Sequence, residues 1–175
     1  MFPWILIAIL IGTPLIIFTC YIPGTTVSPW VPTNKKAKYR VITMAKLTTE
    51  DTVIDLGCGN GVLLVEAYKK AHCKVMGVDC APLQCFLAKL NFLVHGVKGK
   101  IKMQDLFKAD ISKATVIFLF LLPKVMEDLK PKLQKELRPG SKIVSYTFPF
   151  EDWEPNEVDW PKDQMPVYVY TVKKK

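Results

Sequence analysis

From residue 35 to its end, the chain alternates between two patterns of apolar and polar residues. Helical spacing of apolar residues predicts four helices, and short apolar runs between them predict strands. The predicted helices cover residues 35–47, 62–71, 82–95 and 124–137, and the predicted strands cover residues 52–56, 74–78, 100–103, 115–121 and 142–147. This alternation indicates an α/β fold with a mainly parallel sheet that helices cover on both faces. Two later runs, residues 157–160 and 167–172, predict a closing antiparallel hairpin.

The first 34 residues differ from the rest because none of them is charged, although the chain has 24 Lys and Arg and 16 Asp and Glu. Residues 2–22 form an apolar run as long as the ~20 residues that a helix needs to cross a bilayer. A cleaved signal peptide is the main alternative, but its positive n-region, shorter apolar core and small-residue cleavage site are not apparent. We therefore expect an N-terminal transmembrane anchor, residues 1–30, followed by one domain, residues 31–175.

The first basic residues after the apolar run predict its orientation. They are Lys35, Lys36, Lys38 and Arg40. The positive-inside rule then places the domain on the cytoplasmic side of a single-pass protein, or on the matrix side in an organelle. These cations would also attract anionic lipid, although a solvated basic helix face is an equal alternative. The net charge of +8 does not indicate nucleic-acid binding, because the lysines are spread along the chain without an aromatic and basic recognition motif.

The cysteines and histidines do not predict a metal site or a disulfide framework. The five cysteines are odd in number and form no CxxC pair. His72 and His95 have no neighbours with metal-ligand spacing. Reduced thiols fit a domain that faces the cytosol.

A glycine-rich segment follows the first predicted strand and precedes a helix, which is the position of a nucleotide-binding loop. It consists of Asp55, Leu56, Gly57, Cys58, Gly59, Asn60 and Gly61. A dinucleotide is disfavoured, because Val62 stands where its fingerprint has Gly or Ala and because Asp55 would repel a pyrophosphate. A ligand that carries an ammonium and a sulfonium would be attracted instead. We therefore expect S-adenosylmethionine as the cofactor.

Two further acids follow the next predicted strands. Asp79 ends the second strand, about 20 residues after the glycines, where a carboxylate accepts hydrogen bonds from ribose hydroxyls. Asp105, with the adjacent Leu106, follows the third strand and is assigned to the adenine. The alternative for Asp55 and Asp79 is the capping of a helix or a turn.

With these residues, the chain resembles the class I S-adenosylmethionine-dependent methyltransferases, a Rossmann-like α/β fold, over nearly all of residues 30–172. It is most similar to the membrane-anchored protein-lysine methyltransferases of the ATP synthase c-subunit and the adenine nucleotide carrier, and to their prokaryotic relatives. The matching stretches are Val31-Pro32-Thr33, residues 53–61, QDLF at 104–107, LFLLP at 119–123, residues 129–145, and Phe148-Pro149-Phe150 followed by Trp153. The chain departs from the family at Asn60 and Val62, where an acidic residue and Arg are frequent, and at Ala81, where Asn is expected. The resemblance implies that the segment around Pro32 and Thr33 closes over the cofactor.

The acceptor is expected at the carboxyl ends of the strands, where ligands of open α/β sheets bind. The segments predicted to shape its channel contain Leu122, Pro123, Phe148, Pro149, Phe150 and Trp153. Ordinary hydrophobic lining and a rigid turn are the alternative for these residues. A lysine amine in an apolar pocket needs no strong base, because desolvation lowers its pKa from the usual ~10.4.

Three functions remain open from the sequence. The first is a membrane-anchored protein-lysine methyltransferase with a membrane-protein substrate. The second is a small-molecule or lipid methyltransferase, which the same anchor would serve. The third is a non-catalytic S-adenosylmethionine-binding protein.

Overall fold

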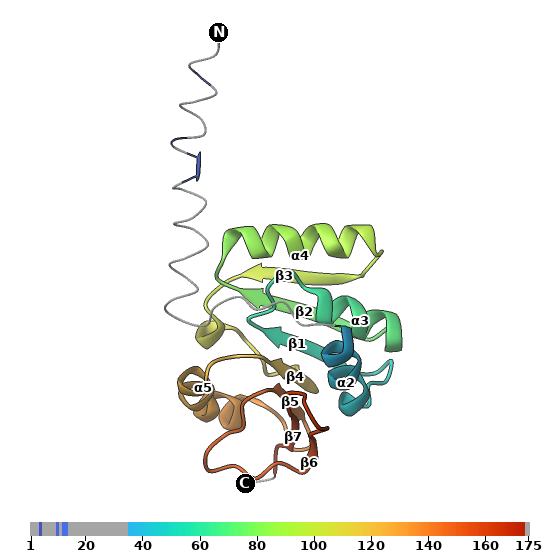
Figure 1. Cartoon of the computed structure of the whole chain (residues 1–175), viewed down its shortest axis with the longest axis vertical. Helices are drawn as coiled ribbons and strands as arrows, with labels where there is room; N and C mark the ends of the chain where they lie inside the picture. Colours follow the sequence, from blue (N-terminus) through green and yellow to red (C-terminus); the bar gives the residue numbers. More distant parts are fainter. Residues whose placement is uncertain (1–3, 5–9, 11, 14–34, 174–175) are drawn as a thin grey trace.

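The computed structural model describes residues 35–173, together with residues 4, 10, 12 and 13. The described domain is built on a seven-stranded sheet with the strand order β3-β2-β1-β4-β5-β7-β6 (Figure 1). Its strands are β1 (Thr52–Leu56), β2 (Lys74–Asp79), β3 (Gly99–Met103), β4 (Val116–Leu119), β5 (Lys142–Tyr146), β6 (Glu157–Asp159) and β7 (Val167–Thr171). The first five strands are parallel, and β7 pairs antiparallel with both β5 and β6. The mainly parallel sheet and the closing antiparallel hairpin are confirmed.

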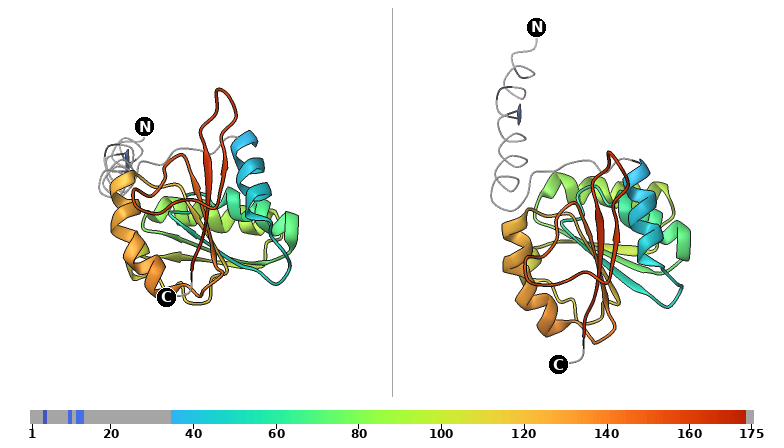
Figure 2. Two further views of the ribbon diagram at one scale, coloured as in Figure 1. Left: turned by 90° about the horizontal axis from the view of Figure 1, so that it is seen from below. Right: turned by 60° about the horizontal axis from the view of Figure 1, so that its bottom comes forward.

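Helices lie on both faces of the sheet, as Figure 2 shows. They are α2 (Lys35–Ala45), α3 (Val62–Ala71), α4 (Pro82–Val94) and α5 (Pro123–Glu136), with a 3₁₀ helix η1 (Leu106–Lys108) after β3. The helices α2, α3 and α4 pack on one face, and α5 covers the other together with residues 104–115 and 147–156. Apart from η1, which was not predicted, each of these strands and helices agrees with its predicted range to within two residues at each end.

The central strands are buried on both faces because their apolar residues are continuous. All four residues of β4 are buried, and they alternate between the two apolar clusters: Val116 and Phe118 face α3, whereas Ile117 and Leu119 face α5. The predicted strand over residues 115–121 is therefore too long. After Leu119 the chain leaves the sheet, and Leu121 packs beside Gly57 at the end of β1.

The predicted transmembrane anchor, residues 1–30, lies almost entirely outside the described residues. Within the part of the chain that the structure describes, no helix is long and apolar enough to cross a bilayer. Thr33 also lies outside the described residues, so its predicted contact with the cofactor stays a prediction.

Candidate functional site

The glycine-rich loop connects β1 to α3 at the point where the strand order reverses between β1 and β4. In open α/β sheets, ligands bind at this reversal, outside the carboxyl ends of the strands. Gly57, Gly59 and Gly61 have φ angles of 83°, 52° and 73°. At Gly57 a Cβ would also lie 2.9 Å from Cδ2 of Leu121. The loop conformation therefore requires glycine, as its sequence indicated.

Backbone hydrogen bonds hold this loop in place. The N–H groups of Gly57 and Cys58 both donate to the Val78 carbonyl oxygen, at 2.8 and 3.1 Å. The Asn91 side chain, on α4, donates to the Asn60 carbonyl oxygen at 2.8 Å. The loop is thus fixed against β2 and α4 by protein groups alone.

Asp79 ends β2 and contacts the glycine-rich loop directly. The Gly59 N–H donates to its Oδ2 atom, and the Ala81 N–H donates to its Oδ1 atom, both at 2.8 Å. Each carboxylate oxygen retains a lone pair that accepts a further hydrogen bond. Asp79 therefore caps the turn and also keeps the capacity to accept hydrogen bonds from a ribose, so the two interpretations from the sequence are compatible.

Asp55 is buried, with 6% of its surface exposed. Burial and, to a smaller extent, the negative charge of Asp79 raise the pKa of the Asp55 carboxyl from its ordinary value to about 8. Within the described part of the chain, no hydrogen bond reaches this carboxyl group. A buried acid without such partners is stabilised by a nearby cation, so the site fits the ammonium and sulfonium of S-adenosylmethionine.

Asp105 lies at the carboxyl end of β3 and is exposed. Its Oδ1 atom accepts a hydrogen bond from the Phe107 N–H at 2.9 Å, so it caps η1, and the adjacent Leu106 is buried in the core. The Gln104 N–H donates to the Asp79 carbonyl oxygen at 2.9 Å, which ties the two strand ends together. The structure thus brings the residues predicted to hold the cofactor, apart from Thr33, to the carboxyl ends of adjacent strands.

The residues predicted to shape the acceptor channel divide into two groups. Leu122, Pro123 and Pro149 are exposed, and Phe148 is half-buried. Phe150 is buried and packs with Trp153 and Tyr170, with ring centroids 5.1 to 5.5 Å apart. The Phe150 N–H also donates to the Tyr170 hydroxyl at 3.0 Å. Phe150 and Trp153 therefore belong to the core beneath α5, and the acceptor role of all these residues stays a prediction.

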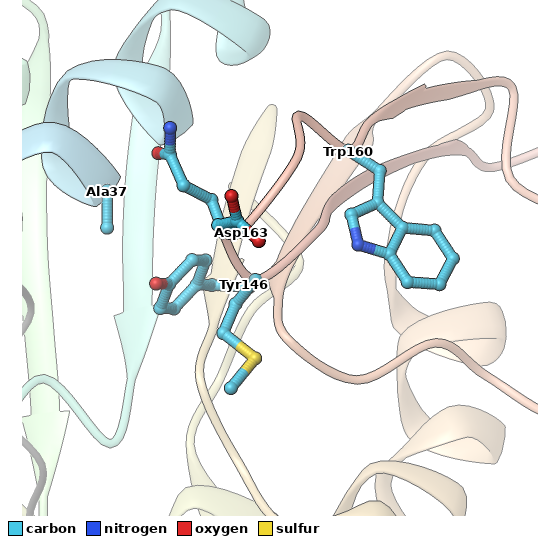
Figure 3. Close-up of a pocket in the computed structure, with 6 residues that line it drawn as sticks. Ala37, Tyr146, Trp160 and Asp163 are labelled. Carbon is cyan, nitrogen blue, oxygen red and sulfur yellow. The ribbon is translucent and has the colours of Figure 1, made fainter.

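A cavity of about 410 Å³ opens at the carboxyl ends of β5 and β6 (Figure 3). Its lining residues come from α2, from the end of β5 and from the β6–β7 loop, residues 160–166: Ala37, Tyr146, Trp160, Asp163, Gln164 and Met165. Tyr146 also packs edge-to-face on Phe120, which follows β4, with ring centroids 4.9 Å apart. This aromatic pair connects the cavity to the strand next to the glycine-rich loop. The sequence did not predict these residues, because Ala37 and the loop are more than 120 residues apart in the chain.

Arg40 fixes the β6–β7 loop to α2. Its guanidinium donates to the Asp159 carboxylate and carbonyl oxygens, both at 2.6 Å, and to the Met165 carbonyl oxygen at 2.8 Å. A longer contact of 3.5 Å reaches the Gln164 side chain. Arg40 thus attaches the rim of the cavity to α2, which is far from the loop in the sequence.

Thr147, directly after Tyr146, has a strained backbone. Its φ angle is 79°, which is unfavourable for a β-branched residue. Its Oγ1 atom is buried, and within the described residues it has no hydrogen-bond partner. Strain of this kind is found at functional sites. The described residues contain no cluster of three or more His, Cys, Asp or Glu side chains that could hold a metal ion.

The domain resembles known methyltransferases in both sequence and structure. The family description "ANTKMT methyltransferase domain" matches residues 55–157. A protein-lysine N-methyltransferase from Saccharolobus islandicus is 39% identical over 158 residues, which cover 87% of this chain and 96% of that protein. The human lysine N-methyltransferase of the ATP synthase c-subunit is 29% identical over 74% of this chain, but the match spans only 56% of the human protein. A solved structure of an RNA methyltransferase from Salinibacter ruber, in complex with S-adenosyl-L-homocysteine, has a TM-score of 0.80 and 33% identity, and the match covers 83% of this chain and 95% of that one.

Proposed function

Because the chain belongs to the ANTKMT family of S-adenosylmethionine-dependent protein-lysine methyltransferases, we propose that it is membrane-anchored and methylates a lysine of a membrane-embedded protein. The main observation in favour of a lysine is that aromatic and acidic side chains line the cavity, which lies at the same edge of the sheet as the proposed cofactor site. Among the relatives, the human protein is named for the ATP synthase c-subunit, and a mouse protein that is 31% identical over 59% of this chain is named for adenine nucleotide translocase.

The cofactor residues in this proposal are the glycine-rich loop and the three acids at the strand ends. When bound, S-adenosylmethionine supplies a methyl group on a positively charged sulfur. Asp79 accepts hydrogen bonds from the ribose, and Asp105 and Leu106 hold the adenine. The Asp55 carboxylate is buried and accepts no hydrogen bond from the described residues. It offsets the positive charge of the cofactor. The Gly57 to Gly61 backbone leaves room for the ligand to approach.

The cavity provides what a lysine acceptor needs. Tyr146 and Trp160 present aromatic rings, which attract an ammonium group, and Asp163 adds a negative charge at the rim. Contact with these rings would remove part of the water around the amine, which lowers the pKa of the amine and favours the neutral nucleophile. Methyl transfer then depends chiefly on alignment, and the Phe120–Tyr146 pair positions the cavity wall relative to the cofactor edge.

The membrane part of the proposal is supported by the sequence. The uncharged run over residues 2–22 is long enough to serve as a single-pass anchor, and Lys35, Lys36, Lys38 and Arg40 follow it. This arrangement favours a domain on the cytoplasmic side, or on the matrix side in an organelle. An anchored enzyme meets membrane-embedded acceptors at a high local concentration.

The function is tested by incubating the detergent-solubilised full chain with methyl-labelled S-adenosylmethionine, membranes and, separately, RNA. We expect label in a protein band, on the Nε atom of a lysine when the peptide is sequenced by mass spectrometry. Label in the organic extract would support a lipid or small-molecule methyltransferase instead, and label in RNA would contradict the protein substrate. Tight cofactor binding with no label in any fraction would indicate a non-catalytic binding protein. Asp79→Ala serves as the control that removes cofactor-dependent labelling.

The anchor is tested by deleting residues 1–30. The described sheet and its helices lie entirely from residue 35 onward, so the shortened protein should still bind S-adenosylmethionine. Its methylation of a membrane-embedded acceptor should fall, whereas its methylation of the same acceptor in detergent should not. Equal rates on membranes for the two proteins would contradict the anchoring role.

A further inference from the structure

The helix α4 is apolar on two opposite sides. Its inner side contributes Cys85, Ala88 and Phe92 to the core. Its outer side is expected to be polar, because surface helices normally present charged residues to water. The outer side of α4 does not follow that rule.

Five large apolar side chains of α4 are exposed. They are Leu83, Phe86, Leu90, Leu93 and Val94. Their spacing of three and four residues places them along one stripe of the helix. Phe86 is 63% exposed and Leu93 is 79% exposed, so the stripe is not covered by another part of the described domain. A contiguous exposed apolar surface of this kind marks an interaction site.

The segment that contains α4 and β3 carries charges of one sign. Between Pro82 and Met103 the chain has four lysines and no acidic residue. The lysines are Lys89, on α4 itself, and Lys98, Lys100 and Lys102, in and next to β3, which is the edge strand beside α4. All four are exposed. As Figure 1 shows, α4 and β3 together form one end of the domain, far from β6.

We propose that the outer face of α4 docks on an anionic lipid bilayer, with the helix axis parallel to the membrane surface. Leu, Phe and Val residues on one side and flanking lysines are the composition of interfacial helices. The lysines match the negative charge of such a surface. A second copy of this chain fits less well, because a symmetric contact would bring its own lysines against these.

Docking through α4 orients the site relative to the bilayer. Asp79 lies only three residues before Pro82, the first residue of α4. Met103, at the end of β3, and Phe107, in η1, are also exposed apolar residues. The cofactor edge of the sheet is thus held close to the surface in which the proposed acceptor lies. This inference extends the proposed membrane location from the N-terminal segment to the domain itself.

The test places the photoreactive analogue p-benzoylphenylalanine at position 86 in the full chain, reconstituted into phosphatidylcholine vesicles with or without phosphatidylglycerol. The matched control carries it at position 158, on β6, because Val158 is also exposed and lies on the strand at the opposite edge of the sheet. Irradiation should give lipid adducts at position 86 and several-fold fewer at position 158. The yield at position 86 should fall several-fold without phosphatidylglycerol.

A charge series completes the test. The triple change Lys98→Gln, Lys100→Gln and Lys102→Gln should lower the lipid adduct yield at position 86 several-fold. The control triple Lys113→Gln, Lys124→Gln and Lys135→Gln removes the same charge from exposed positions outside this region and should leave the yield unchanged. Adducts to a second copy or to residues 2–22, equal yields at positions 86 and 158, or no lipid adduct would each overturn the proposal. The adducts are measured without methyl transfer, so this result is independent of the acceptor assignment.

Discussion

The two halves of the carboxyl edge of the sheet are built in different ways. At the ends of β1 to β3, the glycine-rich loop, Asp79 and Asp105 are held by hydrogen bonds with backbone groups at the same or the adjacent strand end. At the ends of β5 and β6, the cavity is assembled from residues far apart in the chain, and the strained Thr147 directly follows one of them, Tyr146. In the proposed function, the cofactor would therefore bind a rigid motif formed by adjacent strand ends, whereas the acceptor would bind a cavity formed by tertiary packing. Changes in the first half should therefore alter cofactor affinity, and changes in the second should alter turnover of the acceptor.

The largest effect is expected from Asp79→Ala. The change removes the ribose acceptor and leaves the Gly59 and Ala81 N–H groups without their partner. Hydrogen bonds to a charged group are worth about 1.5–3 kcal/mol, so cofactor affinity should fall by about one to two orders of magnitude. Calorimetric titration measures the affinity, with thermal unfolding as the check that the variant is folded. An unchanged affinity in a folded variant would remove Asp79 from the site.

The next effect concerns the pH dependence of cofactor affinity. With a pKa of about 8, Asp55 is mostly protonated in the free protein at pH 7, whereas a cationic ligand favours its ionised form. Affinity should therefore rise about tenfold from pH 7 to pH 9, and Asp55→Asn should flatten that rise. The ionisation of the ligand affects the variant and the parent equally. The difference between their affinity–pH profiles therefore gives the contribution of Asp55.

The same group makes a prediction for stability. The pKa of the Asp55 carboxyl is higher in the folded protein than in the unfolded chain, where it is near ~3.9. The contribution of Asp55 to stability is therefore fully present below the pKa of the unfolded chain and is lost as the pH rises through about 8. Over this pH range, the free energy of unfolding of the cofactor-free parent protein should decline. In Asp55→Asn it should decline less steeply. Parallel profiles for the two proteins in urea titrations would contradict the buried-acid assignment.

A smaller effect is expected from the cavity. Trp160→Ala and Tyr146→Ala each remove an aromatic ring that faces the proposed acceptor, which should lower kcat/KM for the acceptor by about fivefold. Cofactor affinity should stay unchanged, since neither residue lies at the ends of β1 to β3. The conservative change Trp160→Phe is the control and should retain most activity. A parallel loss of cofactor affinity would show that the two halves of the edge are not separate.

The smallest effect is expected from Thr147→Gly. Glycine adopts a φ angle of 79° without strain and removes the buried, unpartnered Oγ1 atom. The greater conformational entropy of glycine in the unfolded chain opposes this relief of strain. The free energy of unfolding should therefore rise by about 1 kcal/mol or less. The urea midpoint measures the gain, and single-turnover kinetics measure whether turnover falls at the same time. A destabilised variant would mean that the backbone at this position is not strained.

The sequence was sufficient for the fold and the cofactor half because their signals are local. The glycine spacing and the acid at the end of β2 each occupy a fixed place relative to a strand, and the structure brings them together. The cavity could not be predicted, because no spacing rule relates Ala37 on α2 to Trp160 and Gln164 in a hairpin loop. Phe148, Phe150 and Trp153 were assigned to the channel because they follow the carboxyl end of a strand. Two of them pack against Tyr170, a contact across 17 to 20 residues that this position does not reveal. The exposed face of α4 was also missed, since apolar periodicity does not distinguish a core side from a solvent side.

The attachment of Arg40 to the β6–β7 loop has a consequence for chimeric enzymes. A chimera that exchanges the β6–β7 loop would test whether this loop sets the substrate range. Here two of the oxygen atoms that Arg40 contacts belong to Gln164 and Met165 of this loop, and two belong to Asp159, directly before it. A transplanted loop without matching acceptors would leave a half-buried guanidinium without part of its hydrogen bonds, and would lose its fixed position over the cavity. The unit to exchange is therefore α2 together with the β6–β7 loop, although the two are separated by most of the chain.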